Sequence, residues 1–254
     1  MTDKFLQTKF GQFLLSYWGI ILLIAGWQAW VYFGNLNSIV MPSPGAVALD
    51  IFGNIGLYLK NGALTLMLAI CGLVAGMFVG TAIAVVAWTS RIASGIFVPL
   101  GLILSSIPIV ALIPILARLL GYDIKTVLAI VVIISFFPSF VFTSAGLNAL
   151  PPGSSDLFKV FGANRIRRFV FLVLPSAVPS WMIALRLTAP PAVLVAMLAE
   201  FLMGTNGMGG MFRTSLDDFA MDRAIGTSLI ATAVSTVAFL LATYAESRVK
   251  ERWS

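Results

Sequence analysis

The 254-residue sequence contains no histidine, a single cysteine and few charged residues. With Cys71 as the only cysteine, no internal disulfide can form, and the ligand sets of the usual zinc sites are absent. Charged residues make up 10% of the chain, whereas a soluble domain typically carries about 25%. So few charges could not cover a water-facing surface. The sequence also lacks a GxxxxGK[ST] phosphate loop and any nucleophile, base or metal constellation, which argues against an ATPase or a membrane enzyme.

Apolar residues dominate instead, at 59% of the sequence, with a mean hydropathy of +1.00. We therefore expect an all-α membrane protein with one transmembrane domain over 1–254, because about 20 apolar residues span a bilayer and the length suits six spans. The first apolar segment is too long for a signal peptide and is interpreted as a retained span. The predicted spans are residues 13–33, 62–88, 96–117, 126–147, 177–203 and 224–245.

A shorter helix is predicted over 43–60, between the first two spans. Ser43 is its expected cap and Pro44 its first-turn residue. Apolar residues recur in it at a spacing of four, which is typical of a helix that lies on the membrane or on the bundle rather than crossing it. This stripe consists of Val47, Ile51, Ile55 and Leu59.

Glycines and prolines mark three of the spans. In the second, Gly72, Gly76 and Gly80 allow another helix to approach closely, and packing within the bundle is favoured over a dimer contact. Pro99, Pro108 and Pro114 make the third span irregular, so it is either a broken helix that lines a pathway or a kinked packing helix. The fifth span is expected to be interrupted at Pro190-Pro191.

Lysine and arginine counts predict the orientation of the chain, whose net charge is +6. The basic residues flank apolar spans, which favours membrane topology over nucleic-acid binding. Five of them fall on the predicted outer side: Lys60, Arg118, Lys125, Arg213 and Arg223. Ten fall on the side of both termini, which we therefore expect in the cytoplasm: Lys4, Lys9, Arg91, Lys159, Arg165, Arg167, Arg168, Arg248, Lys250 and Arg252.

A polar, basic segment separates the fourth and fifth spans, and a short helix is predicted there over 153–163. Pro151-Pro152 should end the preceding helix, Ser154 or Ser155 should cap the new one, and Asp156 falls in its first turn. Gly162 follows where a left-handed turn should stop it. The apolar residues expected on one face are Leu157, Phe158 and Phe161. From the residues alone, this helix could dock on a partner or simply anchor in the membrane interface.

The segment fits the pattern acidic-x5-Gly-x9-aliphatic-x-Leu-Pro, which resembles the cytoplasmic coupling loop of binding-protein-dependent ABC importer permeases. An ordered series of further motifs resembles the nitrate/sulfonate/taurine-type branch of that family. The series covers roughly Pro42 to the C-terminus. Its members are Pro42-Ser43-Pro44, Ser106-Ile107-Pro108, Ala184-Leu185-Arg186-Leu187, Ala199-Glu200 and Gly207-Met208-Gly209.

The resemblance implies a type I importer permease in a bacterial cytoplasmic (inner) membrane, with no catalytic residues, metal or cofactor of its own. Its implied partners are a second, identical permease, two ATPase subunits that bind ATP and Mg, and an extracytoplasmic substrate-binding protein. The implied cargo is an oxyanion, a sulfonate or a pyrimidine-like vitamin precursor. The residues implied to dock on the ATPase are Asp156, Leu157, Phe158, Phe161, Gly162, Arg165 and Arg168. The alternative function is a secondary transporter or channel without ATPase subunits.

Candidate pathway or gate residues are Ser106, Pro108, Glu200 and Met203. Glu200 and Arg186 are the only ionisable residues within the predicted spans, where charges are expensive and usually functional. Glu200 is expected either to bond a neighbouring span or to contact substrate. Arg186 is expected to reach the cytoplasmic interface with its long side chain. The run from Gly204 to Gly210 is interpreted as a flexible external loop, near Asp217, Asp218 and Asp222, which either meet a binding protein or are solvated.

Overall fold

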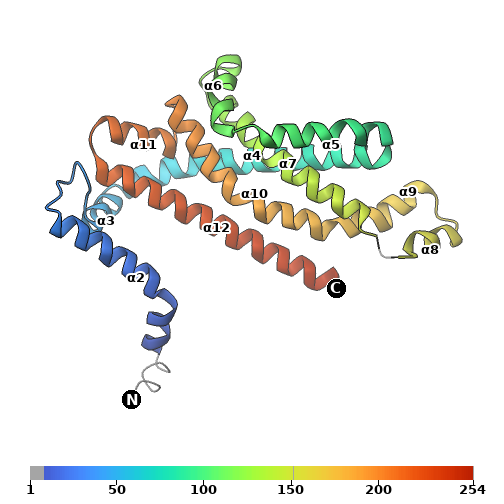
Figure 1. The fold of residues 1–254 in the computed structure, drawn as a ribbon, viewed down its shortest axis with the longest axis horizontal. Coiled ribbons are helices and arrows are strands. Elements are labelled where there is room, and N and C mark those ends of the chain that lie inside the picture. Colours follow the sequence, from blue (N-terminus) through green and yellow to red (C-terminus); the bar gives the residue numbers. More distant parts are fainter. Residues whose placement is uncertain (1–8, 151, 254) are drawn as a thin grey trace.

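The computed structural model describes residues 9–150 and 152–253, so Lys4 and Pro151 lie outside the described residues. The described residues form helices joined by short loops, with no strand among them (Figure 1). The helices are α2 (Lys9–Phe33), α3 (Pro44–Gly53), α4 (Ile55–Thr89), α5 (Arg91–Ser106), α6 (Ile109–Leu120), α7 (Ile124–Asn148), α8 (Ser154–Val160), α9 (Arg165–Arg168), η1 (Phe169–Val173), α10 (Leu174–Met203), α11 (Met208–Asp217) and α12 (Met221–Trp253).

Within the described residues, four continuous helical segments are long and apolar enough to cross a membrane. They are α4, α7, the run Arg165–Met203 that joins α9, η1 and α10, and α12. Shorter apolar helices occur in α2, α3, α5 and α6. The prediction of an all-helical membrane protein is confirmed, and the remaining two predicted spans correspond to α2 and to the broken pair α5–α6.

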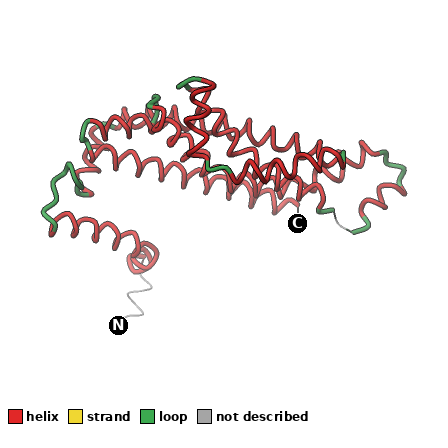
Figure 2. The backbone as a smooth tube through the Cα atoms, turned by 45° about the horizontal axis from the view of Figure 1, so that its top comes forward, coloured by secondary structure: helices red, strands yellow, loops and turns green. Residues whose placement is uncertain are grey.

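The long helices lie side by side along the longest axis of the molecule, as both the ribbon and the tube view show (Figures 1 and 2). Helices α8 and α9 lie at one end of this bundle, and α3 and α11 lie at the other (Figure 1). α2 extends away from the bundle beyond α3 (Figure 1). One apolar core joins α4, α7, α10 and α12, and a smaller one joins α4, α7, η1 and α10 near the α8 end.

The glycine stripe of α4 packs against α7. A Cβ at Gly72 would lie 2.6 Å from the Val131 side chain, and one at Gly76 would lie 2.7 Å from Ser135 Cβ. A Cβ at Gly80 would lie 2.9 Å from the backbone nitrogen of Phe140. Each distance is too short for a real side chain, so close packing within the bundle is confirmed for this stripe.

The helix expected over 43–60 is shorter than predicted. It ends at Gly53, and residues from Ile55 onward begin α4. Asn54 separates the two helices by donating from its side chain to the carbonyl of Asp50 at 3.1 Å and to its carboxylate at 2.9 Å. This local bonding competes with a continuous helix. The cap is as expected, because Ser43 Oγ accepts from the Ala46 amide at 3.2 Å.

Proline breaks one predicted span and leaves another intact. α5 ends at Ser106 and α6 begins at Ile109 after Pro108, so the third span is broken there. The interruption expected at Pro190-Pro191 is wrong, because α10 runs continuously through both prolines. The α10 helix is packed against α12 there, and Ser235 Oγ donates to the Pro190 carbonyl at 3.0 Å. A proline frees the carbonyl four residues before it, here those of Arg186 and Leu187, and such prolines are tolerated within membrane helices.

Candidate functional site

Helix α8 begins at a glycine rather than at a serine cap. Gly153 is the N-cap, with a left-handed φ of 79°, and it forms no side-chain cap. Ser154 and Ser155 therefore lie inside the helix, and the expectation that one of them caps it is wrong. Asp156 does fall in the first turn, where a negative charge is favourable, and it accepts from Lys159 Nζ at 2.9 Å.

The C-terminus of α8 is closed by Gly162, as predicted. Gly162 has a left-handed φ of 70°, and its amide donates to the Lys159 carbonyl at 2.9 Å. The next amide, that of Ala163, donates to the Phe158 carbonyl at 2.9 Å. These two bonds form a Schellman motif, which satisfies the end carbonyls and turns the chain sharply. The seven-residue helix thus has a defined stop despite its length.

Two arginines tie this turn to the bundle. Arg168 Nη1 donates to Ser155 Oγ at 3.0 Å, which links α9 back to α8. Arg165 Nη2 donates to the carbonyl of Thr89 at 3.2 Å, at the C-terminal end of α4, where a cation is favourable. The Arg165 and Arg168 side chains, predicted to contact a partner, are thus used in part to position α8. The rings of Trp88 and Phe169 add a contact at 5.3 Å between centroids.

Apolar side chains project from this loop. Val160 is 82% exposed, Phe161 79% and Leu157 55%, and Phe158 is only half-buried. Ile166 in the next helix is also exposed. These exposed apolar groups lie on a segment outside the bundle, which makes them a candidate interaction surface. The sequence analysis did not include Val160 and Ile166 in this surface. The three-residue spacing between Leu157 and Val160 does place those two residues on one helix face.

Glu200 is a buried structural residue. It is 0% exposed, and the Thr65 hydroxyl of α4 lies 2.8 Å from its Oε2 and donates to the carboxylate. The Gly209 amide donates to the same oxygen at 3.0 Å, and the Met208 amide donates to Thr65 Oγ1 at 2.8 Å. The carboxylate and the hydroxyl therefore cap the first turn of α11 from two different helices. Two roles were expected for Glu200, a bond to a neighbouring span or a contact with substrate. This arrangement agrees with the first.

The segment after α10 is compact and is not a flexible loop. Gly207 has a φ of 118°, and an added Cβ there would collide with the Glu200 carboxylate. At Gly209 and Gly210 an added Cβ would collide with the backbone carbonyls of Met197 and Thr205. Only glycine fits such close backbone approaches. These glycines seat α11 on the end of α10.

The four candidate pathway residues do not share one cavity. Ser106 and Pro108 lie at the break between α5 and α6, where Ser106 Oγ donates to the Leu102 carbonyl at 2.9 Å. Met203 lines a different cavity of about 440 Å³, between the start of α4, the 204–207 turn and α11. Glu200 is sealed behind that cavity by its own hydrogen bonds.

Arg186 forms an ion pair across the bundle. Its Nη1 lies 3.0 Å from Glu246 Oε2 in α12, and the Glu246 side chain is 3% exposed. Lys250 Nζ lies 2.7 Å from Glu246 Oε1. The expectation that Arg186 reaches the cytoplasmic interface stays a prediction, and the structure adds a partner for its guanidinium, the buried carboxylate of Glu246 in another helix.

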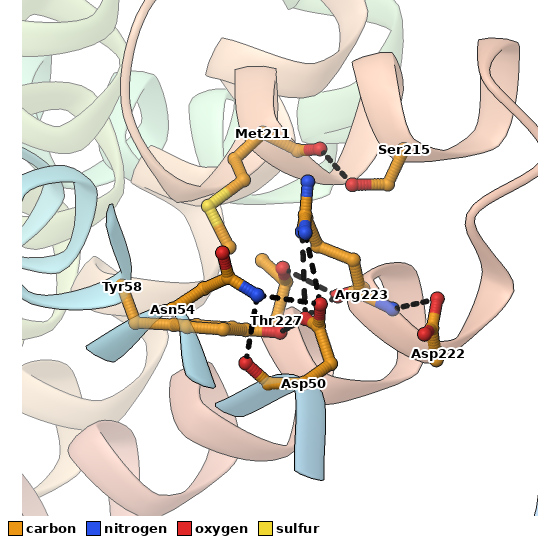
Figure 3. A network of polar contacts seen from close by, with 8 residues as sticks. All are labelled: Asp50, Asn54, Tyr58, Met211, Ser215, Asp222, Arg223 and Thr227. Carbon is orange, nitrogen blue, oxygen red and sulfur yellow. Dashed lines mark hydrogen bonds and ion pairs between the residues drawn. The ribbon is translucent and has the colours of Figure 1, made fainter. Parts of the chain in front are cut away.

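A second polar cluster joins α3, α4 and α12 at the end opposite to α8 (Figure 3). Arg223 Nη2 and the Tyr58 hydroxyl donate to the Asp50 carboxylate at 2.9 and 2.7 Å, and Asn54 donates at 2.9 Å. Burial raises the pKa of Asp50, but these hydrogen bonds and the Arg223 charge outweigh it and hold the pKa below its ordinary value. We call Asp50, Asn54, Tyr58 and Arg223 the α3 clasp.

No metal centre is evident in the described chain, which contains no group of three or more histidine, cysteine, aspartate or glutamate side chains arranged to hold an ion. The candidate site consists of the exposed apolar side chains of α8 together with Arg165 and Arg168, which bond α4 and α8.

Comparison with known proteins was made at the level of family, curated sequences and solved structures. A family model described as binding-protein-dependent transport system inner membrane component matches residues 72–251. No curated protein matches the sequence. The fold is similar to a crystal structure of an amino acid ABC transporter with histidines, at a TM-score of 0.66 and 15% identity, covering 80% of this chain and 97% of that one.

Two inward-facing crystal forms of the MetNI methionine ABC transporter are also similar. Their TM-scores are 0.63 and 0.64, with 14% and 16% identity. The matches cover 76% and 77% of this chain and 96% and 97% of the transporter chains. At such identities these similarities concern the fold alone.

Proposed function

The chain belongs to the family of binding-protein-dependent transport system inner membrane components, and from this premise we propose that the α8–α9 turn is the part on which the ATPase subunits act. As a member of that family, it is the non-catalytic permease subunit of an ABC importer, a multi-pass inner-membrane protein. ATP is bound by the partner ATPase. The alternative of a transporter without ATPase subunits is thereby set aside.

The observation that carries the proposal is the exposure of Leu157, Val160 and Phe161 on one turn of helix outside the bundle. A fully exposed phenylalanine offers about 150–250 Å² of apolar surface, so these three side chains supply the centre of a small interface. Asp156 and Lys159, both exposed, supply its polar rim.

The rigid attachment of α8 explains how movement of a partner would reach the membrane helices. Gly162 fixes the exit of the chain, and Arg165 bonds the end of α4. From Arg165 the helix continues without a break to Met203. A displacement of α8 therefore acts on α4 and α10 together, the two helices that share Glu200 and Thr65. The ATPases must bind one arrangement of these helices more tightly than the other for ATP to shift their equilibrium.

Co-purification of the ATPase tests the proposal. Phe161→Asp places a charge on the apolar surface without touching the Schellman bonds, and it should abolish recovery of ATPase with the solubilised permease. Phe52→Asp is the matched control, because Phe52 is 75% exposed on α3 at the opposite end of the bundle. Equal ATPase recovery with both variants would refute the docking role of α8.

The finer features of the transporter are also proposed. We infer that two identical copies form the membrane unit, that both termini and α8 face the cytoplasm, and that α3 and α11 face the binding protein. The ten-to-five distribution of basic residues supports this orientation. The motif series supports a nitrate/sulfonate/taurine-type cargo class, and equilibrium binding of candidate anions and pyrimidines to the cognate binding protein tests it.

A further inference from the structure

A cavity of about 260 Å³ lies between α4, α5 and α7, near the end of the bundle that carries α9. Its apolar walls include Ala84, Ala87, Trp88 and Val98. Trp88 also contacts Phe169 of η1, and the neighbouring Thr89 accepts the hydrogen bond from Arg165. Trp88, which lines the cavity, is therefore next in sequence to Thr89, whose hydrogen bond with Arg165 anchors the α8–α9 turn.

The polar lining of this cavity is rich in donors and has no acid. It consists of Arg91, Ser94, Ser144 and Asn148, whose side-chain amide also donates to the Ser144 carbonyl at 2.7 Å. Ser144 Oγ is buried and has no hydrogen-bond partner within the described chain. Arg91 forms no ion pair with any carboxylate of the described residues. A buried hydroxyl without a partner is costly, so Ser144 Oγ is available to bond a ligand in the cavity.

A topological role for Arg91 does not explain these features. A lysine or arginine beside a span fixes orientation without any cavity next to it. Here the guanidinium shares a cavity with two hydroxyls and an amide, and the volume is several times the roughly 30 Å³ that one water occupies in the liquid. Arginine with hydroxyl and amide donors is the set that recognises phosphate-type oxyanions.

We propose that this cavity binds a phosphate-type oxyanion, with Arg91 as the charged ligand and Ser94, Ser144 and Asn148 as neutral ones. The group is either the phosphate of an anionic phospholipid in the adjoining leaflet or a free oxyanion from the aqueous phase. Bound there, it joins α4, α5 and α7 beside Trp88. A ligand that binds only this arrangement of helices stabilises it and thereby resists movement of the α8–α9 turn.

Two measurements on the purified full-length chain in neutral detergent test the site. The first titrates inorganic phosphate against potassium chloride at constant ionic strength and follows the thermal midpoint and the intrinsic fluorescence, to which Trp88 contributes as one of six tryptophans. The second counts anionic phospholipid retained per chain by native mass spectrometry. Arg91→Gln should weaken phosphate binding about tenfold or more, or remove the retained lipid, because it deletes a charge-assisted hydrogen bond. Arg91→Lys should restore part of either signal, and Ser144→Ala should weaken it less.

Controls separate binding from general effects of charge and from misfolding. Arg118→Gln removes an exposed arginine that does not line this cavity, and it should leave both signals unchanged. Trp88→Phe should remove the fluorescence change but keep the thermal shift. Saturable phosphate binding lost in Arg91→Gln identifies a free oxyanion, and retained lipid lost in that variant identifies a headgroup. If the unmodified chain shows neither signal, or Arg91→Gln and Arg118→Gln behave alike while remaining monodisperse, the site does not exist.

Discussion

The α3 clasp provides a prediction whose size follows from the structure. Asp50 and Arg223 join a short helix near the N-terminus to the beginning of α12, with side chains 8% and 32% exposed (Figure 3). Removing one partner of a fully buried ion pair costs about 3–5 kcal/mol. Arg223 is partly hydrated, and Asp50 keeps its bonds from Tyr58 and Asn54. We therefore expect Arg223→Met to lower the free energy of unfolding by about 2 kcal/mol.

The complementary substitution should cost less. Asp50→Asn keeps an acceptor for the Tyr58 hydroxyl and leaves Arg223 free to turn toward solvent, so we expect a loss of about 1 kcal/mol. The double variant should then be less destabilised than the sum of the two single variants, with a coupling of about 1 kcal/mol or more. Asp218→Asn is the matched control, because Asp218 is exposed.

Denaturant unfolding of the permease in detergent at neutral and acidic pH measures these effects. The pKa of Asp50 is held below its ordinary value of 3.8, so its contribution is complete above that value and is lost as the pH falls through the lower folded-state value. The difference between the unmodified chain and Asp50→Asn should therefore disappear only in strong acid. Additive single variants, or a difference that does not change with pH, would refute this description of the clasp.

Two further predictions concern packing and charge inside the bundle. Gly209→Ala should destabilise the protein by about 2 kcal/mol, because the added methyl collides with the backbone of α10. Thermal unfolding measures this loss. The control is Gly62→Ala, whose added methyl meets only Met208 Sδ at 3.7 Å. Glu246→Gln should cost about 2–3 kcal/mol and depend little on salt, because the carboxylate is buried against Arg186; a strong salt dependence in the unfolding free energy would contradict this.

Local sequence patterns predicted much of the fold because many of its features depend only on the backbone conformations that neighbouring residues allow. The left-handed turn at Gly162, the close approach along Gly72, Gly76 and Gly80, and the break at Pro108 all follow from backbone conformations that few residue types permit. The helices themselves follow from continuous apolar segments, since a membrane leaves the backbone no other way to satisfy its polar groups.

What sequence could not supply depends on partners distant in the chain. Glu246 pairs with Arg186, which lies sixty residues earlier in another helix, and no local pattern predicts that pair. Ser235 of α12 donates to the Pro190 carbonyl of α10, and periodicity does not show that these two helices are neighbours. The start of the short helix near Gly153 was predicted, but the cap was assigned to a serine, because a serine cap and a left-handed glycine compete for the same position.

Cross-linking from α8 tests the central claim most directly. Cys71 is the only cysteine, so a Cys71→Ser background carrying Val160→Cys presents one thiol at the most exposed position of the turn. With the assembled transporter in inverted membrane vesicles, we predict that a short bifunctional reagent joins this thiol to the ATPase subunit, and that its yield changes when ATP is added. A thiol that reacts only with reagents supplied from the opposite side of the membrane, or that never joins the ATPase, would contradict the account.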